Sequence, residues 1–305
     1  MTLGRREFFI RAAAVGAGVT LGHDLVLGGE PVALPPGKAA SGKAELRISS
    51  QDGIIPGGSL REKVEKMEKW GFDGLEVWGG GLPGRVKEIQ EALRGTRIRL
   101  GAICAGYDGV MVSDDREVRG KAISSMREIL AAAGELGSTG LVCVPAFNGQ
   151  TKLGNKECRE VLLEILPELA DAAQKAGTRL LLEPLNRGEA FFLRLLADGA
   201  AICRDARHPA VCMMGDFYHM GIEETSDLGA FISAGSYLHH VHLATTEGRT
   251  LPGDDGGKRS YVDGFRGLKI IGYQDYCSFE CGVRGDHMTA IPKAMQFLKS
   301  QWAQA

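Results

Sequence analysis

Four side chains of metal-binding type lie at the downstream ends of short apolar runs in the second half of the chain. They are Glu183, Asp216, His242 and Glu280, and the runs are RLLLE, VCMMGD, LHHVHL and YCSFE. The spacings of 33, 26 and 38 residues each fit about one strand-plus-helix unit, which takes roughly 30 residues. Three carboxylates that converge repel one another unless a cation lies between them. Three oxygen donors and one imidazole suit a divalent cation such as Mn²⁺, with Zn²⁺ as an alternative.

The elements that must position these residues alternate regularly after residue 44. Strands are expected at 45–50, 74–79, 97–105, 140–146, 179–185, 210–216, 237–244 and 276–281, with helices at 60–70, 85–93, 116–136, 157–176, 191–204, 226–234 and 291–302. Eight such units predict an α/β fold, a single (β/α)₈ TIM barrel over residues 45–305. An open doubly wound sheet is the competing arrangement, and it is disfavoured because no glycine-rich phosphate fingerprint follows the first strand.

The alternation of side chains along each strand predicts which of these residues face the barrel interior. His240 and His242 share the inner face of the seventh strand, and His239 points outward. Glu183 and Glu280 lie on inward-facing registers of the fifth and eighth strands. Because the carboxyl ends of parallel barrel strands form one face, we expect the four candidate ligands to converge there.

The amino-terminal segment reads as an export signal followed by a linker. Residues 4–11 read GRREFFIR, and an Ala/Gly-rich, weakly apolar stretch follows to about residue 22. This pattern resembles a twin-arginine signal over residues 1–22, with a linker over 23–44, and predicts a periplasmic protein. A disordered basic tail is the alternative interpretation. The apolar stretch is too short to span a membrane, and no Cys follows it, so no stable membrane anchor is expected.

The composition favours a small neutral substrate. The formal net charge is −2 and 24% of the 305 residues are charged, so no basic face is available and nucleic acid is not an expected partner. Seven Cys residues occur without a CxxC pair, which indicates buried thiols rather than a disulfide framework. The sequence leaves the oligomeric state open, a homo-oligomer included.

Four segments resemble a known superfamily. They are EPLNRGE at 183–189, DFYHMGIEE at 216–224, HVHLATTEGRTLPG at 240–253 and SFECGVRGD at 278–286. Together they resemble the xylose-isomerase-like superfamily of sugar isomerases and epimerases, including ketose 3-epimerases and hydroxypyruvate isomerases, over residues 45–302. The resemblance implies that Glu183, Asp216, His242 and Glu280 bind one Mn²⁺, Mg²⁺, Co²⁺ or Zn²⁺ ion. It also implies that Glu183 and Glu280 carry out the proton chemistry.

The resemblance also points to residues that contact a carbohydrate substrate. These are His219, Arg249, Glu189 and Trp78, with Tyr107 and Phe147 as further candidates for the wall of the site. It implies that Glu189 tunes the basicity of Glu183 and that His219 hydrogen-bonds a substrate oxygen. Arg249 lies one residue further from His242 than the matching arginine of 3-epimerases, which favours other branches of the superfamily.

Such a site removes a proton next to a carbonyl and passes through an enediolate, with a metal that polarises the carbonyl. We therefore expect a metal-dependent sugar isomerase or epimerase. Two alternatives stay open: a lyase or deglycosidase of 3-keto-glycosides on the same barrel, and a non-catalytic sugar-binding protein. An abasic-site endonuclease of this fold is disfavoured, because it needs more strand-end ligands than the seven His residues supply.

Overall fold

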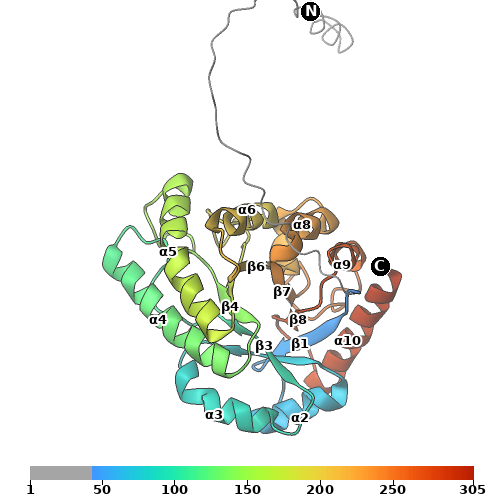
Figure 1. Ribbon diagram of the computed structural model, residues 1–305. Coiled ribbons are helices and arrows are strands. Elements are labelled where there is room, and N and C mark those ends of the chain that lie inside the picture. The colour runs from blue at the N-terminus through green and yellow to red at the C-terminus, as the bar shows by residue number, and fades with distance from the viewer. Residues whose placement is uncertain (1–42) are drawn as a thin grey trace, which may run out of the picture. The chain divides into compact units, whose positions relative to one another are not determined.

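Eight parallel strands close into a barrel in the computed structural model, which describes residues 43–305 (Figure 1). Each strand pairs with the next along the chain and the last pairs with the first. The strands are β1 Arg47–Gln51, β2 Gly74–Trp78, β3 Arg99–Cys104, β4 Gly140–Cys143, β5 Leu180–Leu182, β6 Val211–Asp216, β7 Leu238–Leu243 and β8 Tyr276–Phe279. The predicted (β/α)₈ barrel is confirmed. The expected export signal and most of the linker lie outside the described residues.

Helices surround the barrel and connect consecutive strands (Figure 1). They are α2 Leu60–Trp70, α3 Leu82–Leu93, α4 Arg116–Glu135, α5 Asn155–Ala176, α6 Leu196–Ala206, α7 Phe217–Glu223, α8 Asp227–Ala234, the short 3₁₀ helix η1 Gly235–Tyr237, α9 Val262–Ile270 and α10 His287–Gln304. Between residues 43 and 305, none of the helices has the length and apolarity needed to cross a membrane.

Two helices, α7 and α9, were not predicted from the sequence. Helix α9 reads VDGFRGLKI, and its two glycines lower its intrinsic helix propensity. Packing explains both: a Cβ at Gly264 would lie 2.5 Å from the ring of Phe217, and one at Gly267 would lie 3.0 Å from Cβ of Phe231. Helix α9 therefore approaches α7 and α8 too closely for larger residues. Helix α6 also begins later than expected, at residue 196 rather than 191.

The interior of the barrel is apolar on one side and polar on the other. Ala102, Val142, Leu181, Cys212 and Met214 form an apolar cluster contributed by β3 to β6. The strands β1, β2, β7 and β8 instead contribute Ser49, Glu76, His240 and Ser278, all fully buried. At the amino ends of the strands, a Cβ at Gly74 would lie 2.6 Å from the ring of Tyr276, so this ring fills the barrel floor. The polar side of the interior continues toward the carboxyl ends of the strands, where the four predicted ligands lie.

Candidate active site

The four predicted ligands converge at the carboxyl ends of β5 to β8. One ligand atom from each of Glu183, Asp216, His242 and Glu280 lies within 4.8 Å of the others. Asp216 and His242 are fully buried, and Glu183 is 6% exposed. Asp216 also caps α7, because its Oδ1 accepts a hydrogen bond from the Tyr218 N–H at 2.8 Å. That bond fixes the carboxylate and leaves Oδ2 facing the site.

His242 is oriented by a buried carboxylate that sequence reasoning missed. Its Nε2 lies 3.0 Å from Oε1 of Glu76, on β2, and Glu76 also accepts from Nε2 of His240 at 2.7 Å. In the neutral imidazole the Nε2 proton therefore faces Glu76, and the Nδ1 lone pair faces the site. Nδ1 lies 3.0 Å from Glu280 Oε2 and 3.8 Å from Glu183 Oε1. Burial alone would raise the pKa of Glu76, but the two histidines hold that pKa well below its usual value.

Gln51 links Glu76, which lies deeper in the barrel, to Glu280 in the site. Its Nε2 donates to Glu76 Oε1 at 2.9 Å and to Glu280 Oε1 at 3.2 Å. The Cys104 thiol lies 3.8 Å from the same Glu280 oxygen. These contacts hold Oε1 of Glu280 and leave its Oε2 toward His242. A polar residue ending the first strand, and a carboxylate inside the second, were the signals available in the sequence for Gln51 and Glu76.

His219 is a neutral hydrogen-bond donor aimed at the ligands. Its Nδ1 accepts from the Asn186 N–H at 3.1 Å and from Asn186 Nδ2 at 2.8 Å, so the proton resides on Nε2. Nε2 lies 3.4 Å from Asp216 Oδ2. Burial, followed by the charge of Arg249, lowers the pKa of His219 to about 3. His219 lies beside the predicted ligands, and its role as a substrate contact stays a prediction.

Glu189 hydrogen-bonds Asn186, the residue that orients His219. Its Oε1 accepts from Asn186 Nδ2 at 2.9 Å and lies 3.9 Å from His219 Nδ1. Sequence reasoning paired Glu189 with Glu183, whereas these contacts place it behind His219. These contacts place Glu189 where it supports the orientation of the His219 imidazole.

Arg249 supplies a positive charge to the tetrad formed by Glu183, Asp216, His242 and Glu280. Its Nη2 lies 3.2 Å from Asp216 Oδ2 and hydrogen-bonds Glu280 Oε2. Its guanidinium also lies 4.7 Å from the ring centroid of Tyr218. The Arg249 backbone is left-handed, with φ of 45°, which is uncommon for a non-glycine residue and frequent at functional loops. Burial opposes the charged guanidinium, but the neighbouring carboxylates raise the pKa of Arg249.

The carboxylates of the tetrad differ in their electrostatic surroundings. Burial raises the pKa of Glu183, and burial together with the charge of Glu280 raises the pKa of Asp216 to about 7. Burial also acts on Glu280, but His242 and Arg249 outweigh it and lower the pKa of Glu280 to about 2. Crowded acids of this kind are favoured as anions by a divalent cation.

The donor set fits such a cation. Nδ1 of His242 and Nε2 of His219 are buried and make no well-aligned hydrogen bond with any of residues 43–305, although carboxylate oxygens lie 3.0 Å and 3.4 Å from them. Buried polar nitrogens nearly always make such a bond. Three carboxylates and one imidazole nitrogen, Nδ1 of His242, surround a common point. Glu183, Asp216, His242 and Glu280 would therefore hold one divalent metal ion.

A cavity of about 550 Å³ opens above the tetrad. It is lined by the predicted residues Glu183, Glu280, His219, Arg249, Glu189, Trp78, Tyr107 and Phe147, among others. The fold therefore brings together all the predicted substrate contacts. The hydroxyl of Tyr107 donates to the carbonyl of Val144 at 2.6 Å and accepts from its N–H at 3.1 Å. Tyr107 is therefore tied to the backbone of Val144 through its hydroxyl.

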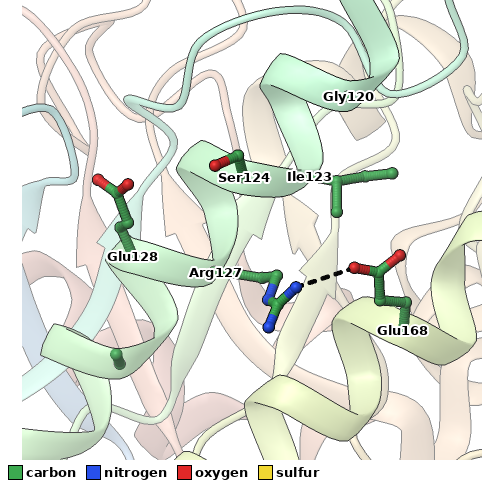
Figure 2. Close-up of a pocket in the computed structure, with 7 residues that line it drawn as sticks. Gly120, Ile123, Ser124, Arg127, Glu128 and Glu168 are labelled. Carbon is green, nitrogen blue, oxygen red and sulfur yellow. Dashed lines mark hydrogen bonds and ion pairs between the residues drawn. The ribbon is translucent and has the colours of Figure 1, made fainter. Parts of the chain in front are cut away.

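A second concave surface lies on the outside of the barrel between α4 and α5 (Figure 2). This groove of about 700 Å³ is lined by Gly120, Ile123, Ser124, Arg127, Glu128, Ala131 and Glu168. Arg127 Nη1 pairs with Glu168 Oε1 across it at 3.1 Å. Both side chains are more than half exposed, so the pair contributes little. The groove lacks a convergent set of buried ligands, and the barrel mouth is the better candidate for chemistry.

Comparison with known proteins finds a matching family and similar enzymes. A family model described as a xylose isomerase-like TIM barrel matches residues 64–301. The 3-dehydro-D-guloside 4-epimerase of Escherichia coli is 29% identical over 253 residues, which cover 79% of this chain and 94% of the relative. The D-psicose 3-epimerase of Ruminiclostridium cellulolyticum is 29% identical over 233 residues, which cover 72% of this chain and 78% of the relative.

Solved structures give the same result for the fold. The crystal structure of an E. coli 3-keto-D-glucoside 4-epimerase superimposes with a TM-score of 0.78 and 28% identity, covering 84% of this chain and all of that chain. A D-psicose 3-epimerase from Clostridium cellulolyticum superimposes with a TM-score of 0.76 at 23% identity, covering 84% of this chain and 99% of that chain. The resemblance inferred from the four segments is confirmed.

Proposed function

Because the chain belongs to the xylose isomerase-like TIM-barrel family, we propose that it is a divalent-metal-dependent epimerase of a keto sugar. The observation that carries this proposal is the convergence of Glu183, Asp216, His242 and Glu280 within 4.8 Å, under a cavity lined by the predicted substrate contacts. The metal, when bound, supplies positive charge beside the substrate carbonyl and stabilises the negative charge that develops on its oxygen.

The two catalytic carboxylates come from strands on different sides of the ligand position. Glu183 follows β5 and Glu280 follows β8, with Asp216 and His242 between them in strand order. Epimerisation requires one group to remove the proton from one face of a carbon and another to return a proton to the opposite face. Glu183 and Glu280 would each serve one face, and the net change is inversion at that carbon.

The remaining polar residues would fix the orientation of the substrate by hydrogen bonds. His219 donates from Nε2, because Asn186 occupies its Nδ1, so it can hydrogen-bond a substrate oxygen near the carbonyl. Arg249 contacts two of the predicted metal ligands, Asp216 and Glu280, and can donate to a neighbouring substrate hydroxyl. Both side chains line the cavity, which is the arrangement that positions a reacting carbon between two carboxylates.

We propose a 3-keto-glycoside as the substrate class and carbon 4 as the reacting centre. Support comes from the relative named 3-dehydro-D-guloside 4-epimerase, 94% of whose length is matched, and from the similar 3-keto-D-glucoside 4-epimerase structure. The later position of Arg249 relative to His242, compared with the 3-epimerases, favours the same branch.

The test uses methyl 3-keto-glucoside in D₂O with the Mn²⁺-loaded protein and follows the sugar by NMR. Deuterium should enter at carbon 4 and the 4-epimer should form, and neither should occur after metal removal or in Glu183→Gln and Glu280→Gln. Release of methanol would instead indicate a lyase or deglycosidase. Binding without deuterium incorporation would indicate a sugar-binding protein, and exchange that survives in both variants would overturn the assignment of the two glutamates.

We propose Mn²⁺ as the resident ion, since oxygen-rich ligand sets with one imidazole suit it. Metal analysis of the purified protein, followed by reconstitution with Mn²⁺, Mg²⁺, Co²⁺ and Zn²⁺, tests this choice. We also propose that the twin-arginine-type segment directs export to the periplasm. Replacement of Arg5 and Arg6 by Lys should then retain the protein in the cytoplasm.

A further inference from the structure

We propose that Trp78 and Phe147 form an aromatic rim that binds the aglycone of a glycoside substrate, beyond the sugar ring that reacts. This inference rests on the proposed function, because it places the reacting ring over the tetrad. The rim would favour a second sugar or another aglycone with an extended apolar face over a small one. It therefore defines which 3-keto-glycosides the protein uses best.

The mouth of the barrel has two chemically different halves. The charged groups of the tetrad follow β5 to β8, whereas β2 to β4 and their loops contribute Trp78, Tyr107 and Phe147 to the same cavity. A substrate whose carbonyl lies at the tetrad must extend somewhere, and the aromatic half is continuous with it. The C–H faces of pyranose rings and the faces of aromatic aglycones pack on such side chains, which offer large rigid apolar surfaces.

The rim side chains are exposed although they are large and apolar. Trp78 is 56% exposed and Phe147 is 42% exposed. Six large hydrophobic side chains are exposed within residues 43–305, and the two aromatic ones both line this cavity. Single exposed apolar residues are ordinary, but two aromatic residues at the mouth of one polar site mark a ligand-binding surface.

Glycines allow the loops of this half to pack closely against one another. A Cβ at Gly106 would lie 2.1 Å from the backbone nitrogen of Gly80, and a Cβ at Gly79 would lie 2.0 Å from the carbonyl oxygen of Ala105. The loops that follow β2 and β3 therefore touch backbone to backbone. A Cβ at Gly80 would lie 2.5 Å from Nε1 of Trp78, so the indole rests directly on this bare backbone.

The two aromatic residues come from the first and the last strand of this half, because Trp78 ends β2 and Phe147 follows β4. Trp78 is in register with Cys104, whose thiol lies 3.8 Å from Glu280 Oε1. The residue after Phe147 donates its backbone N–H to the carbonyl of Glu189 at 2.8 Å. The rim thus extends from the side of Glu280 to the side of Glu189. A ligand held between Trp78 and Phe147 is continuous with a ring bound over the tetrad.

The experiment compares two substrates that differ only in the aglycone, methyl 3-keto-glucoside and 3-keto-cellobiose, oxidised in the non-reducing ring. Trp78→Ala and Phe147→Ala should lower kcat/KM for 3-keto-cellobiose at least tenfold more than for the methyl glycoside. Ile270→Ala removes a side chain that is 65% exposed on α9 and should change neither value. Equal losses for both substrates, or no loss for either, would overturn the rim.

A binding measurement separates this inference from the proposed function. The chain has three tryptophans, and unoxidised cellobiose should shift the emission of Trp78 in a saturable way that Trp78→Phe abolishes. If neither keto-glycoside is turned over, the epimerase proposal fails, and this titration alone decides the rim. A saturable shift that disappears in Trp78→Phe supports it, and no shift at millimolar cellobiose refutes it.

Discussion

Replacement of Glu76 by glutamine should weaken metal binding without unfolding the barrel. Glu76 is fully buried and accepts from Nε2 of both His240, at 2.7 Å, and His242, at 3.0 Å. A carboxylate offers two acceptor oxygens, whereas a glutamine amide offers one. In Glu76→Gln, one of the two histidines therefore loses its acceptor, and in either case His242 loses the charged acceptor that presents its Nδ1 to the site.

The expected size follows from that lost contact. A hydrogen bond to a charged group contributes about 1.5–3 kcal/mol, and a loss of about 2 kcal/mol corresponds to roughly 30-fold in affinity. This agrees with the 10–100-fold cost usual for residues that orient metal-bound histidines. We therefore expect the dissociation constant for Mn²⁺ to rise about 30-fold in Glu76→Gln.

The assay is calorimetric titration of chelator-treated protein with Mn²⁺ at fixed pH, with circular dichroism as a check on folding. Asp275→Asn provides the matched control, because Asp275 accepts from Nδ1 of His239 at 2.7 Å on the outer face of the same strand. It should bind Mn²⁺ as the unaltered protein does. A folded Glu76→Gln protein that binds Mn²⁺ within twofold of the unaltered protein would refute the reasoning.

Three further predictions follow from other parts of the structure. Burial opposes the charge on His239, but Asp275 outweighs it and raises the pKa of His239 to about 9. The contribution of this ion pair to the free energy of unfolding is complete below pH 6.5 and is lost as the pH rises through 9. Urea unfolding should show that the free energy of unfolding falls by at most about 3 kcal/mol over that range. This pH dependence should be absent in Asp275→Asn. Arg249→Met leaves the carboxylates without their guanidinium, so the free energy of unfolding of the chelator-treated protein should fall by roughly 1–3 kcal/mol. Mn²⁺ should then raise the Tm of this variant more than that of the unaltered protein, and an unchanged Tm in chelator would contradict this. Gly106→Ala combines φ of 86° with a close contact and should cost more than about 2 kcal/mol, whereas Gly137→Ala, at φ of 67° in open space, should cost about 1 kcal/mol; equal costs would show that the contact relaxes.

The barrel and the ligand tetrad could be predicted because both depend on local sequence patterns. Apolar runs at regular spacing specify parallel strands, and strand alternation specifies the faces. His240 and His242 point into the barrel and His239 points outward to Asp275, as expected. Each predicted ligand lies at the carboxyl end of its own strand or directly after it, so its position can be predicted without knowledge of distant partners.

Glu76 and Gln51 could not be assigned in the same way, because their roles depend on closure of the barrel. Glu76 meets a histidine 164 residues later in the chain, and Gln51 meets Glu280, which is 229 residues away. Both pairings cross from the first two strands to the last two, and they form only when β8 pairs with β1. A carboxylate in an otherwise apolar strand is a signal, but its partner lies beyond any local pattern.

The two glutamates that we propose as catalytic are held differently, and that difference would suit epimerisation. Glu280 is anchored through Oε1 by Gln51 at 3.2 Å and bound at Oε2 by Arg249. Glu183 lies 3.8 Å from His242 Nδ1 and 3.9 Å from His219 Nε2, beyond normal hydrogen-bonding distance. One carboxylate is thus fixed and strongly favoured as an anion, and the other is buried and free to exchange a proton. Environments that separate the pKa values of two acids also separate their roles. The polar residues inside the barrel, which hold Glu280 but not Glu183, would therefore give the two carboxylates different roles in proton transfer.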